Sequence, residues 1–223
     1  MFSPTIWPNT TRPWIDTRNN MTTGKFISLE GVDGAGKSTH LDFLAQALRA
    51  KGRQVVLTRE PGGTELGERL RELLLHRGAM QADTEALLMF AARKEHVEQV
   101  IRPALERGDW VISDRFTDAS YAYQCGGRGI AESRLQELEN WVLQGFKPDL
   151  TLIFDVPPDV AAQRRGQARE ADRFEQEAHD FFQRVRNAYL SRAKHEPTRI
   201  KVVNADRTIA AIQQELTSIL EAL

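Results

Sequence analysis

Apolar positions follow two patterns along the chain from residue 21 onward. Five short runs are apolar with little alternation, which is typical of strands buried on both faces; they are 25–30, 54–58, 110–113, 150–156 and 200–203. Between them apolar residues recur at helical spacing, over 36–51, 65–76, 83–107, 116–124, 132–143, 160–165, 174–193 and 209–220. The longest helical run should bend near Pro103. Strands separated by helices predict a parallel sheet with helices on both faces, a three-layer α/β fold.

The first twenty residues lack both patterns. Three prolines interrupt them, with Asn and Thr between, and Trp7 and Trp14 stand in no periodic arrangement. A second methionine, Met21, precedes the first predicted strand. We therefore interpret 1–20 as a flexible or dispensable arm, or as the product of an upstream start codon, and 21–223 as a single domain.

Composition and charge narrow the classes of protein. Of the 223 residues, 41% are hydrophobic and 27% are charged, so the chain has enough apolar surface to build a core. The 30 Lys and Arg against 31 Asp and Glu leave a formal net charge of -1, which argues against a general nucleic-acid or membrane-surface binder. Cys125 is the single cysteine, so an internal disulfide is impossible and we expect a reducing, cytoplasmic location. No apolar run is long enough to predict a membrane span.

The most specific motif follows the first predicted strand. Residues 31–38, GVDGAGKS, match G-x-x-x-x-G-K-[ST] and lead into the first predicted helix, which is the context expected of a P-loop. Glycines let backbone N–H groups surround phosphates, and the helix N-terminus adds partial positive charge. In such a loop Lys37 reaches the outer phosphates and the Ser38 hydroxyl binds Mg²⁺. The simpler alternative is a glycine-rich turn with a solvated lysine.

A P-loop alone does not name a reaction, because GTPases, ATPases and small-molecule kinases share it. An N-K-x-D string, the usual guanine reader of a GTPase, does not occur in this sequence. Four further strings follow at ordered spacing: TREPGG at 58–63, DRF at 114–116, the segment from Ser120 to GGRG at 126–129, and DRFE at 172–175. Together with the P-loop, they resemble the thymidylate kinase family from about residue 25 to the C-terminus.

The resemblance implies a P-loop nucleoside monophosphate kinase fold with a five-stranded parallel sheet. It implies transfer of the γ-phosphoryl group of ATP to dTMP, giving dTDP and ADP for dTTP biosynthesis, with Mg²⁺ as cofactor. The implied partners are ATP, dTMP and a second copy of the chain in a homodimer, with no nucleic acid and no membrane. A lid at about 164–173 would close on ATP.

The resemblance also assigns residues to roles. The catalytic residues would be Lys37, Arg115, Arg164 and Arg169. The ATP site would comprise Gly31, Val32, Asp33, Gly34, Ala35, Gly36, Lys37, Ser38, Thr39, Asn204 and Ala205. The dTMP site would comprise Asp33, Pro61, Phe90, Arg93, Arg115, Ser120, Tyr123 and Gln124. The residues implied for Mg²⁺ are Ser38 directly, and Asp33 and Asp114 through water.

Within the implied dTMP site, Arg115 would hold the phosphate and Arg93 would face the thymine edge. Tyr123 would pack against the sugar where a 2′-hydroxyl would fit, and Pro61 would follow a cis peptide. Each has a simpler interpretation. Arg115 would otherwise be a surface salt bridge, Arg93 part of a solvated helix face, and Tyr123 a core aromatic. Arg59 and Glu60 would form an ion pair that fixes a turn.

The sequence departs from the family pattern at two positions, and at a third it lacks a residue that only some members carry. The aromatic that stacks on thymine usually stands four residues before the helix arginine, where this chain has Met89, with Phe90 beside it; we expect Phe90 to take the role. Cys125 replaces a common glycine and is expected to be a small, semi-buried residue. Gly34 stands where some members carry a P-loop arginine, so arginines of the lid should supply that charge.

The remaining titratable candidates give no second chemistry. His40, His76, His96, His179 and His195 have no metal-ligand spacing and are expected to be structural or exposed. Two alternative functions stay open: a kinase for another nucleoside monophosphate, and a nucleotide-switched binding module without phosphoryl transfer. The acceptor residues that the resemblance implies, Asp33, Arg93, Arg115 and Tyr123, argue against a switch, because a switch needs no second nucleotide pocket.

Overall fold

Five parallel strands form one sheet in the order β2-β3-β1-β4-β5. The computed structural model describes residues 24–76, 78–165, 173–174 and 177–223, so the predicted arm and most of the predicted lid lie outside the described residues. The strands are β1 (Phe26–Glu30), β2 (Val55–Arg59), β3 (Trp110–Asp114), β4 (Leu150–Asp155) and β5 (Ile200–Asn204). This confirms the predicted α/β class, and every predicted strand is found within two residues of its expected ends.

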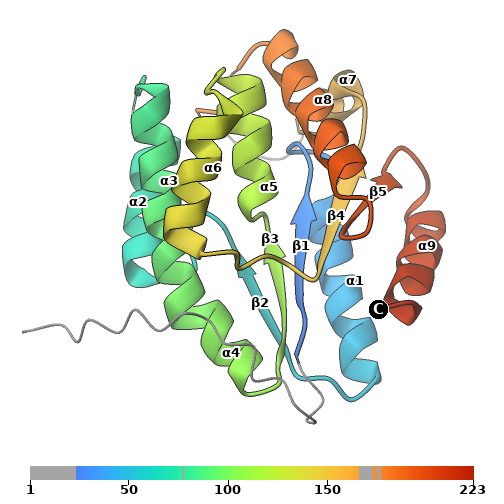
Figure 1. The fold of residues 1–223 in the computed structure, drawn as a ribbon. Helices are drawn as coiled ribbons and strands as arrows, with labels where there is room; N and C mark the ends of the chain where they lie inside the picture. The colour runs from blue at the N-terminus through green and yellow to red at the C-terminus, as the bar shows by residue number, and fades with distance from the viewer. Residues whose placement is uncertain (1–23, 77, 166–172, 175–176) are drawn as a thin grey trace, which may run out of the picture.

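Helices cover both faces of the sheet. Figure 1 shows α2, α3 and α6 on one side of it and α1 and α9 on the other. The helices are α1 (Lys37–Ala50), α2 (Glu65–His76), α3 (Ala82–His96), α4 (Arg102–Glu106), α5 (Thr117–Ser120), α6 (Glu132–Leu143), α7 (Pro158–Arg165), α8 (His179–His195) and α9 (Ile209–Glu221), with π-helical segments η1 (Val97–Ile101) and η2 (Tyr121–Gly127). None of these described helices is long and apolar enough to cross a membrane.

Three helical predictions need correction. The run 83–107 is not one bent helix, because η1 separates α3 from α4 just before Pro103, which lacks a backbone donor and disrupts the regular ladder. The run 116–124 is a short α5 followed by η2, which continues to Gly127. The run 174–193 begins late, at His179, because Phe174 packs against Tyr123 and belongs to the preceding connection.

The central strands explain why the apolar runs showed little alternation. All five residues of β1 are buried, and Ile27, Leu29, Ile112 and Leu152 have no exposed surface. Fully burying a side chain of this size contributes about 1.5–3 kcal/mol relative to leaving it exposed. The sheet is therefore a rigid base from which the segments after each strand project.

All five strands end at the same edge, because the sheet is parallel. β1 lies between β3 and β4, so the chain crosses from one side of β1 to the other between its third and fourth strands. In open α/β sheets ligands bind outside the carboxyl ends of the strands, at such a reversal. The P-loop after β1 and Arg115 after β3 both lie there.

Candidate active site

The loop between β1 and α1 has the backbone that the P-loop motif requires. Gly31 has φ 130°, and a Cβ there would lie 2.5 Å from the carbonyl oxygen of Phe154 on the neighbouring strand. Gly36 is the N-cap of α1 with φ 88°, a left-handed conformation that favours glycine. The loop therefore opens directly into the N-terminus of α1, where Ser38 and Thr39 are exposed.

Lys37 is not a solvated lysine. Its side chain is 5% exposed, and Nζ donates to the carbonyl oxygens of Gly31 at 3.1 Å and Val32 at 3.4 Å. It also forms ion pairs with Asp33 at 3.7 Å and Asp114 at 3.9 Å. The ammonium group thus lies inside the loop, between the acid of the P-loop and the acid that ends β3.

Arg115 reaches the same loop from β3. It has φ 76°, an uncommon left-handed conformation for a residue other than glycine, and its backbone N–H donates to the carbonyl oxygen of Leu29. Its guanidinium donates to Asp33 Oδ1 at 2.9 Å and to the hydroxyls of Tyr123 and Tyr189, each at 3.2 Å. Burial disfavours the charge, but the oxygens of Tyr123 and Asp33 outweigh it and hold the pKa of Arg115 well above its ordinary value.

Beneath Arg115, a buried carboxylate connects β1 to α8. Glu30 has no exposed surface; its Oε1 accepts from the backbone N–H of Phe116 at 2.7 Å and its Oε2 accepts from the Tyr189 hydroxyl at 3.0 Å. Burial, together with the charge of Asp118, raises the pKa of Glu30 to about 8. Tyr189 therefore contacts both Glu30 and Arg115, and it fixes the guanidinium from below.

A second group of buried polar residues lies between α3 and α5. Arg93 is 2% exposed, so the solvated-face interpretation is wrong. Its Nε donates to Glu60 Oε2 at 2.7 Å, and its two terminal nitrogens donate to Ser120 Oγ at 3.0 Å and to the Phe116 carbonyl at 3.1 Å. The guanidinium carbon stands 4.6 Å from the centre of the Phe90 ring. These contacts leave the Arg93 side chain a single well-defined position.

The interpretation of Arg59 and Glu60 as an ion pair is also wrong. Glu60 is buried and contacts Arg93 through one oxygen and His96 Nδ1 through the other at 2.9 Å. Arg59 is exposed and pairs instead with Glu68 at 2.8 Å. Successive side chains at the end of a strand point to opposite faces, which separates the two. The Glu60–Pro61 peptide is cis, as predicted, and Pro61 is buried beside these residues.

The predicted acceptor aromatics are part of the core. Tyr123 is 6% exposed and packs edge-on against Phe174, with the ring centres 5.7 Å apart, while its hydroxyl contacts Arg115. Phe90 is 1% exposed, and Met89 is partly buried against the main core. The structure thus brings Tyr123 to Arg115, the arginine predicted to hold the acceptor phosphate. Which residue stacks on a base stays a prediction.

Cys125 and the histidines occupy ordinary positions. Cys125 is buried in a small apolar cluster, where burial raises the pKa of its thiol to about 12. The described non-glycine residues with positive φ are Arg115 and Gln144, so Cys125 replaces the family's glycine without strain. Of the histidines, His40 and His96 are buried, and His76, His179 and His195 are exposed.

On the predicted ATP side, the described contacts are fewer. Ala205 N–H donates to the carbonyl oxygen of Asp155, which places the turn after β5 beside the end of β4. Arg164, at the end of α7, donates to the Ala205 carbonyl at 3.1 Å and pairs with Asp206 at 3.4 Å. It therefore lies next to the turn predicted to edge the adenine, and Arg169 lies outside the described residues.

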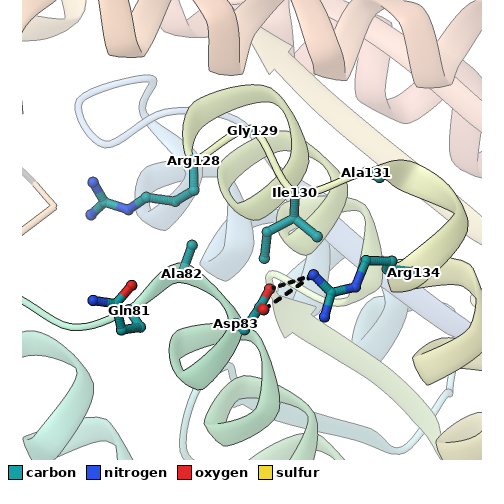
Figure 2. A pocket seen from close by; sticks show the side chains of 8 residues that line it. All are labelled: Gln81, Ala82, Asp83, Arg128, Gly129, Ile130, Ala131 and Arg134. Atoms are coloured by element: carbon teal, nitrogen blue, oxygen red, sulfur yellow. Dashed lines mark hydrogen bonds and ion pairs between the residues drawn. The ribbon is translucent and has the colours of Figure 1, made fainter.

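A separate pocket lies at the start of α3 and α6. Its volume is about 280 Å³, and Asp83 and Arg134 pair across it, as Figure 2 shows. None of its lining residues belongs to the predicted ATP or dTMP sites. The residues predicted for the two phosphate sites lie instead in the side-chain network around Asp33.

The fold and these contacts define a class of protein: a P-loop phosphotransferase with a nucleoside monophosphate kinase fold. The P-loop after β1 and Arg115 after β3 meet at one edge of the sheet, where Asp33 contacts both Arg115 and Lys37.

Comparisons with known proteins agree with this class. The sequence model of the Thymidylate kinase family matches residues 29–216. The thymidylate kinase of Thiobacillus denitrificans is 66% identical over 200 residues, covering 90% of this chain and 98% of that protein. That of Cupriavidus necator is 60% identical over 202 residues, covering 90% and 99%. A crystal structure of thymidylate kinase from Ehrlichia chaffeensis superposes with a TM-score of 0.74 at 35% identity, covering 89% of this chain and 99% of that one. The chain belongs to the thymidylate kinase family.

Sequence reasoning missed Glu30, Tyr189 and Glu85. Glu30 and Tyr189 stand 159 residues apart, and no local pattern links them. Glu85 has no exposed surface although it stands near the start of a helix, where acidic residues are ordinarily solvated. One available signal was the charge of Glu30, which ends the otherwise uncharged strand β1.

Proposed function

We propose that this chain transfers the γ-phosphoryl group of ATP to the phosphate of dTMP, giving ADP and dTDP. The observation that carries this proposal is the position of Asp33. Lys37, the donor-side cation, lies 3.7 Å from its carboxylate, and Arg115, the acceptor-side cation, lies 2.9 Å from it. Two phosphate-binding cations are thus held on either side of one group, where a donor and an acceptor phosphate would meet.

The chemistry requires cations rather than a base. The acceptor phosphate is already anionic at neutral pH, so its oxygen attacks without losing a proton to a side chain. The barrier is the approach of two negative groups and the charge that spreads over the transferred phosphoryl. Lys37 and Arg115 offset that charge in a partly buried site, where electrostatic interactions are stronger than in water.

We assign the acceptor base to the group of buried residues between α3 and the α5–η2 segment. Arg93 and Gln124 offer buried polar groups, and Phe90 and Pro61 offer apolar surface. Ser120, which accepts a hydrogen bond from Arg93, belongs to the same group of residues. We assign thymine to it, with the sugar against Tyr123 and the phosphate on Arg115.

The residues of the P-loop fit a Mg²⁺ ion carried with ATP. Ser38 presents an exposed hydroxyl at the start of α1. Asp114 Oδ1 is buried and has no hydrogen-bond partner among the described residues, although Lys37 pairs with it at 3.9 Å. Ser38 would bind the ion directly, and Asp33 and Asp114 would contact it through water. When bound, Mg²⁺ neutralises charge on the outer phosphates of ATP.

The lid and the assembly complete the proposal. We assign 164–173 to a lid whose arginines, Arg164 and Arg169, supply charge that the P-loop lacks at Gly34. We also propose a homodimer in the cytoplasm. Exposed apolar side chains on three adjacent helices support the dimer: Leu66 on α2, Leu87 on α3 and Trp141 on α6 are 48%, 56% and 76% exposed.

The test is a coupled assay of ADP release with dTMP, dUMP, dCMP and dGMP. We expect dTMP to give the highest kcat/KM, and ADP release to require both Mg²⁺ and an acceptor. ADP release without an acceptor would indicate a nucleotide-switched module, and a preference for another monophosphate would reassign the substrate.

A further inference from the structure

Glu85 is a carboxylate with no exposed surface, and the proposed mechanism gives it no role. Its two oxygens have different partners. Oε1 accepts a hydrogen bond from Gln124 Nε2 at 2.8 Å. Oε2 accepts from the Arg173 guanidinium at 2.7 Å and from Arg128 Nε at 3.3 Å. Two arginines therefore compensate the charge of Glu85, while its other oxygen is left to a neutral amide.

This amide belongs to Gln124, which lies with Arg93 in the group of buried residues between α3 and the α5–η2 segment. Glu85 and Arg93 are both buried on α3, and their partners Gln124 and Ser120 lie on the α5–η2 segment in the reverse order. The two segments thus run antiparallel, joined by two polar contacts. Gln124 and Arg93 are the polar side chains of this group that we assign to the acceptor base.

The contact with Glu85 decides which end of the Gln124 amide faces Glu85. A carboxylate only accepts hydrogen bonds, so the amide must turn its NH₂ group toward it. The carbonyl oxygen of Gln124 then points the other way, and no described residue donates to it. Arg93, in contrast, has only donors, and three partners in the protein use three of its five N–H groups.

We propose that Glu85 is a positioning residue that sets the base preference of the acceptor site. By holding Gln124 with its carbonyl oxygen toward the base, it presents an acceptor beside the donors of Arg93. That pattern matches a base with a ring N–H next to a carbonyl, which is the edge of thymine or uracil. Cytosine carries the reverse pattern, an unprotonated ring nitrogen next to an amino group. The inference rests on the proposed function, in which Gln124 and Arg93 face the acceptor base.

Turning the amide to suit cytosine is unfavourable. It would place the Gln124 carbonyl oxygen 2.8 Å from the Glu85 carboxylate, so that two acceptors would face each other in a buried site. A buried polar group left without its partner costs more than the same group in solvent. Sites built to hydrogen-bond one pattern reject the mismatched substrate strongly for this reason.

The test is Glu85→Gln, which keeps the size of the side chain but lets it donate or accept. We expect the ratio of kcat/KM for dTMP to that for dCMP to fall by ~10-fold or more, because Gln124 is then free to turn. The ratio for dTMP to dUMP should stay within about twofold, since the two bases share this edge. Asp83→Asn is the matched control: it removes a carboxylate two residues away on α3, whose exposed side chain pairs with Arg134, and it should change neither ratio.

A Glu85→Gln enzyme whose ratio for dTMP to dCMP equals that of the parent overturns the inference and leaves the proposed function standing. Equal changes in both ratios also overturn it, because they indicate a general loosening of the pocket. If Glu85→Gln does not fold, the isosteric pair Glu85→Asp and Glu85→Asn carries the test, with discrimination expected to persist only in the Asp variant. A parent enzyme that does not phosphorylate dTMP refutes the proposed function itself.

Discussion

At the residue scale, Asp33 connects the two halves of the candidate site. It pairs with Arg115 at 2.9 Å and lies 3.7 Å from Lys37, so the two cations share one carboxylate. The incoming phosphates would compete with Asp33 for both cations. The carboxylate therefore keeps Lys37 and Arg115 in place and compensates their charge before substrates arrive.

Replacing Lys37 with methionine should abolish turnover while dTMP still binds. Lys37 contacts the P-loop and Asp114, whereas Arg93 and Ser120, which we assign to the acceptor base, lie on α3 and α5. We expect kcat to fall on the order of 10³-fold or more in the ADP-release assay. Calorimetric titration should give a dTMP affinity within a few-fold of the parent.

Lys51→Met is the control, since it removes an exposed lysine at the other end of α1 and should leave kcat unchanged. Normal turnover in Lys37→Met would contradict the P-loop assignment.

Replacing Tyr123 should weaken discrimination against a ribonucleotide more than it weakens dTMP binding. A packed ring excludes a 2′-hydroxyl by contact, which is repulsion rather than attraction. Tyr123→Ala removes the ring, and the ratio of deoxy- to ribonucleotide kcat/KM should fall by ~10-fold. Tyr123→Phe keeps the ring and loses only the hydroxyl that contacts Arg115, so it should fall less.

Melting curves are needed beside these kinetics, because Tyr123 packs among Phe174, Phe181 and Tyr189 and its truncation leaves a cavity. The same ratio in parent and Tyr123→Ala would show that this ring does not contact the sugar.

At the element scale, apolar periodicity predicted the bounds of a helix where the helix packs through one regular apolar face. The bounds of α2 and α6 agree with the apolar periodicity at both ends, because each helix packs through one face on its neighbours. The start of α8 was predicted five residues early, since Phe174 is apolar at helical spacing but packs on Tyr123. Contacts of this kind depend on the fold and leave no trace in a short window of sequence.

The lid is the element on which catalytic charge is expected to depend. Four of the ten residues at 164–173 are arginines, and Gly34 gives the P-loop none. Arg173 does not belong to that supply, because it is tied to Glu85 and to the Leu74 carbonyl at the end of α2. We expect Arg164 and Arg169 to reach the transferred phosphoryl once ATP is bound.

Mutating Arg164 and Arg169 to alanine together should lower kcat by at least ~10²-fold with both substrates saturating, with little change in dTMP affinity. The single variants should lose less, because each arginine compensates for the other. Arg69→Ala, an exposed arginine on α2, is the control. A double variant within about tenfold of the parent kcat would reject these two arginines as the source of charge.

At the scale of the whole molecule, site residues that lie near the end of a strand could be predicted from sequence, whereas buried pairs that are far apart along the chain could not. The P-loop, Arg115 and Pro61 each stand within two residues of the end of a strand. A parallel sheet therefore brings them to one edge, and their sequence motifs were informative. Glu30 and Tyr189 are 159 residues apart, and Glu85 and Gln124 are 39 apart. These pairs are buried polar contacts between elements that are distant in sequence, which only the assembled fold defines.

Removing residues 1–20 should change neither activity nor melting temperature appreciably. The segment has no periodic apolar face that would bury against the domain. The measurement is a pair of melting curves and kcat/KM values for the full chain and for 21–223. A fall in melting temperature of more than a few degrees would show that Trp7 or Trp14 docks on the domain.

The stability of the whole domain should depend on pH through Glu30. Burial and the charge of Asp118 raise its pKa to about 8, far above that of an exposed glutamate. Between those two values the folded state holds a proton that the unfolded state has lost, so stability falls as pH rises, and it levels off above about pH 8. From about pH 6 to about pH 8 the free energy of unfolding should fall by about 2 kcal/mol on account of this group.

Glu30→Gln is neutral at every pH and should lose that part of the pH dependence of stability, whereas Glu72→Gln, exposed on α2, should keep it. Urea unfolding of the three proteins at several pH values measures this. Parallel pH profiles for parent and Glu30→Gln would mean that Glu30 is already ionised in the folded protein at pH 6, held so by Tyr189 and the N–H of Phe116.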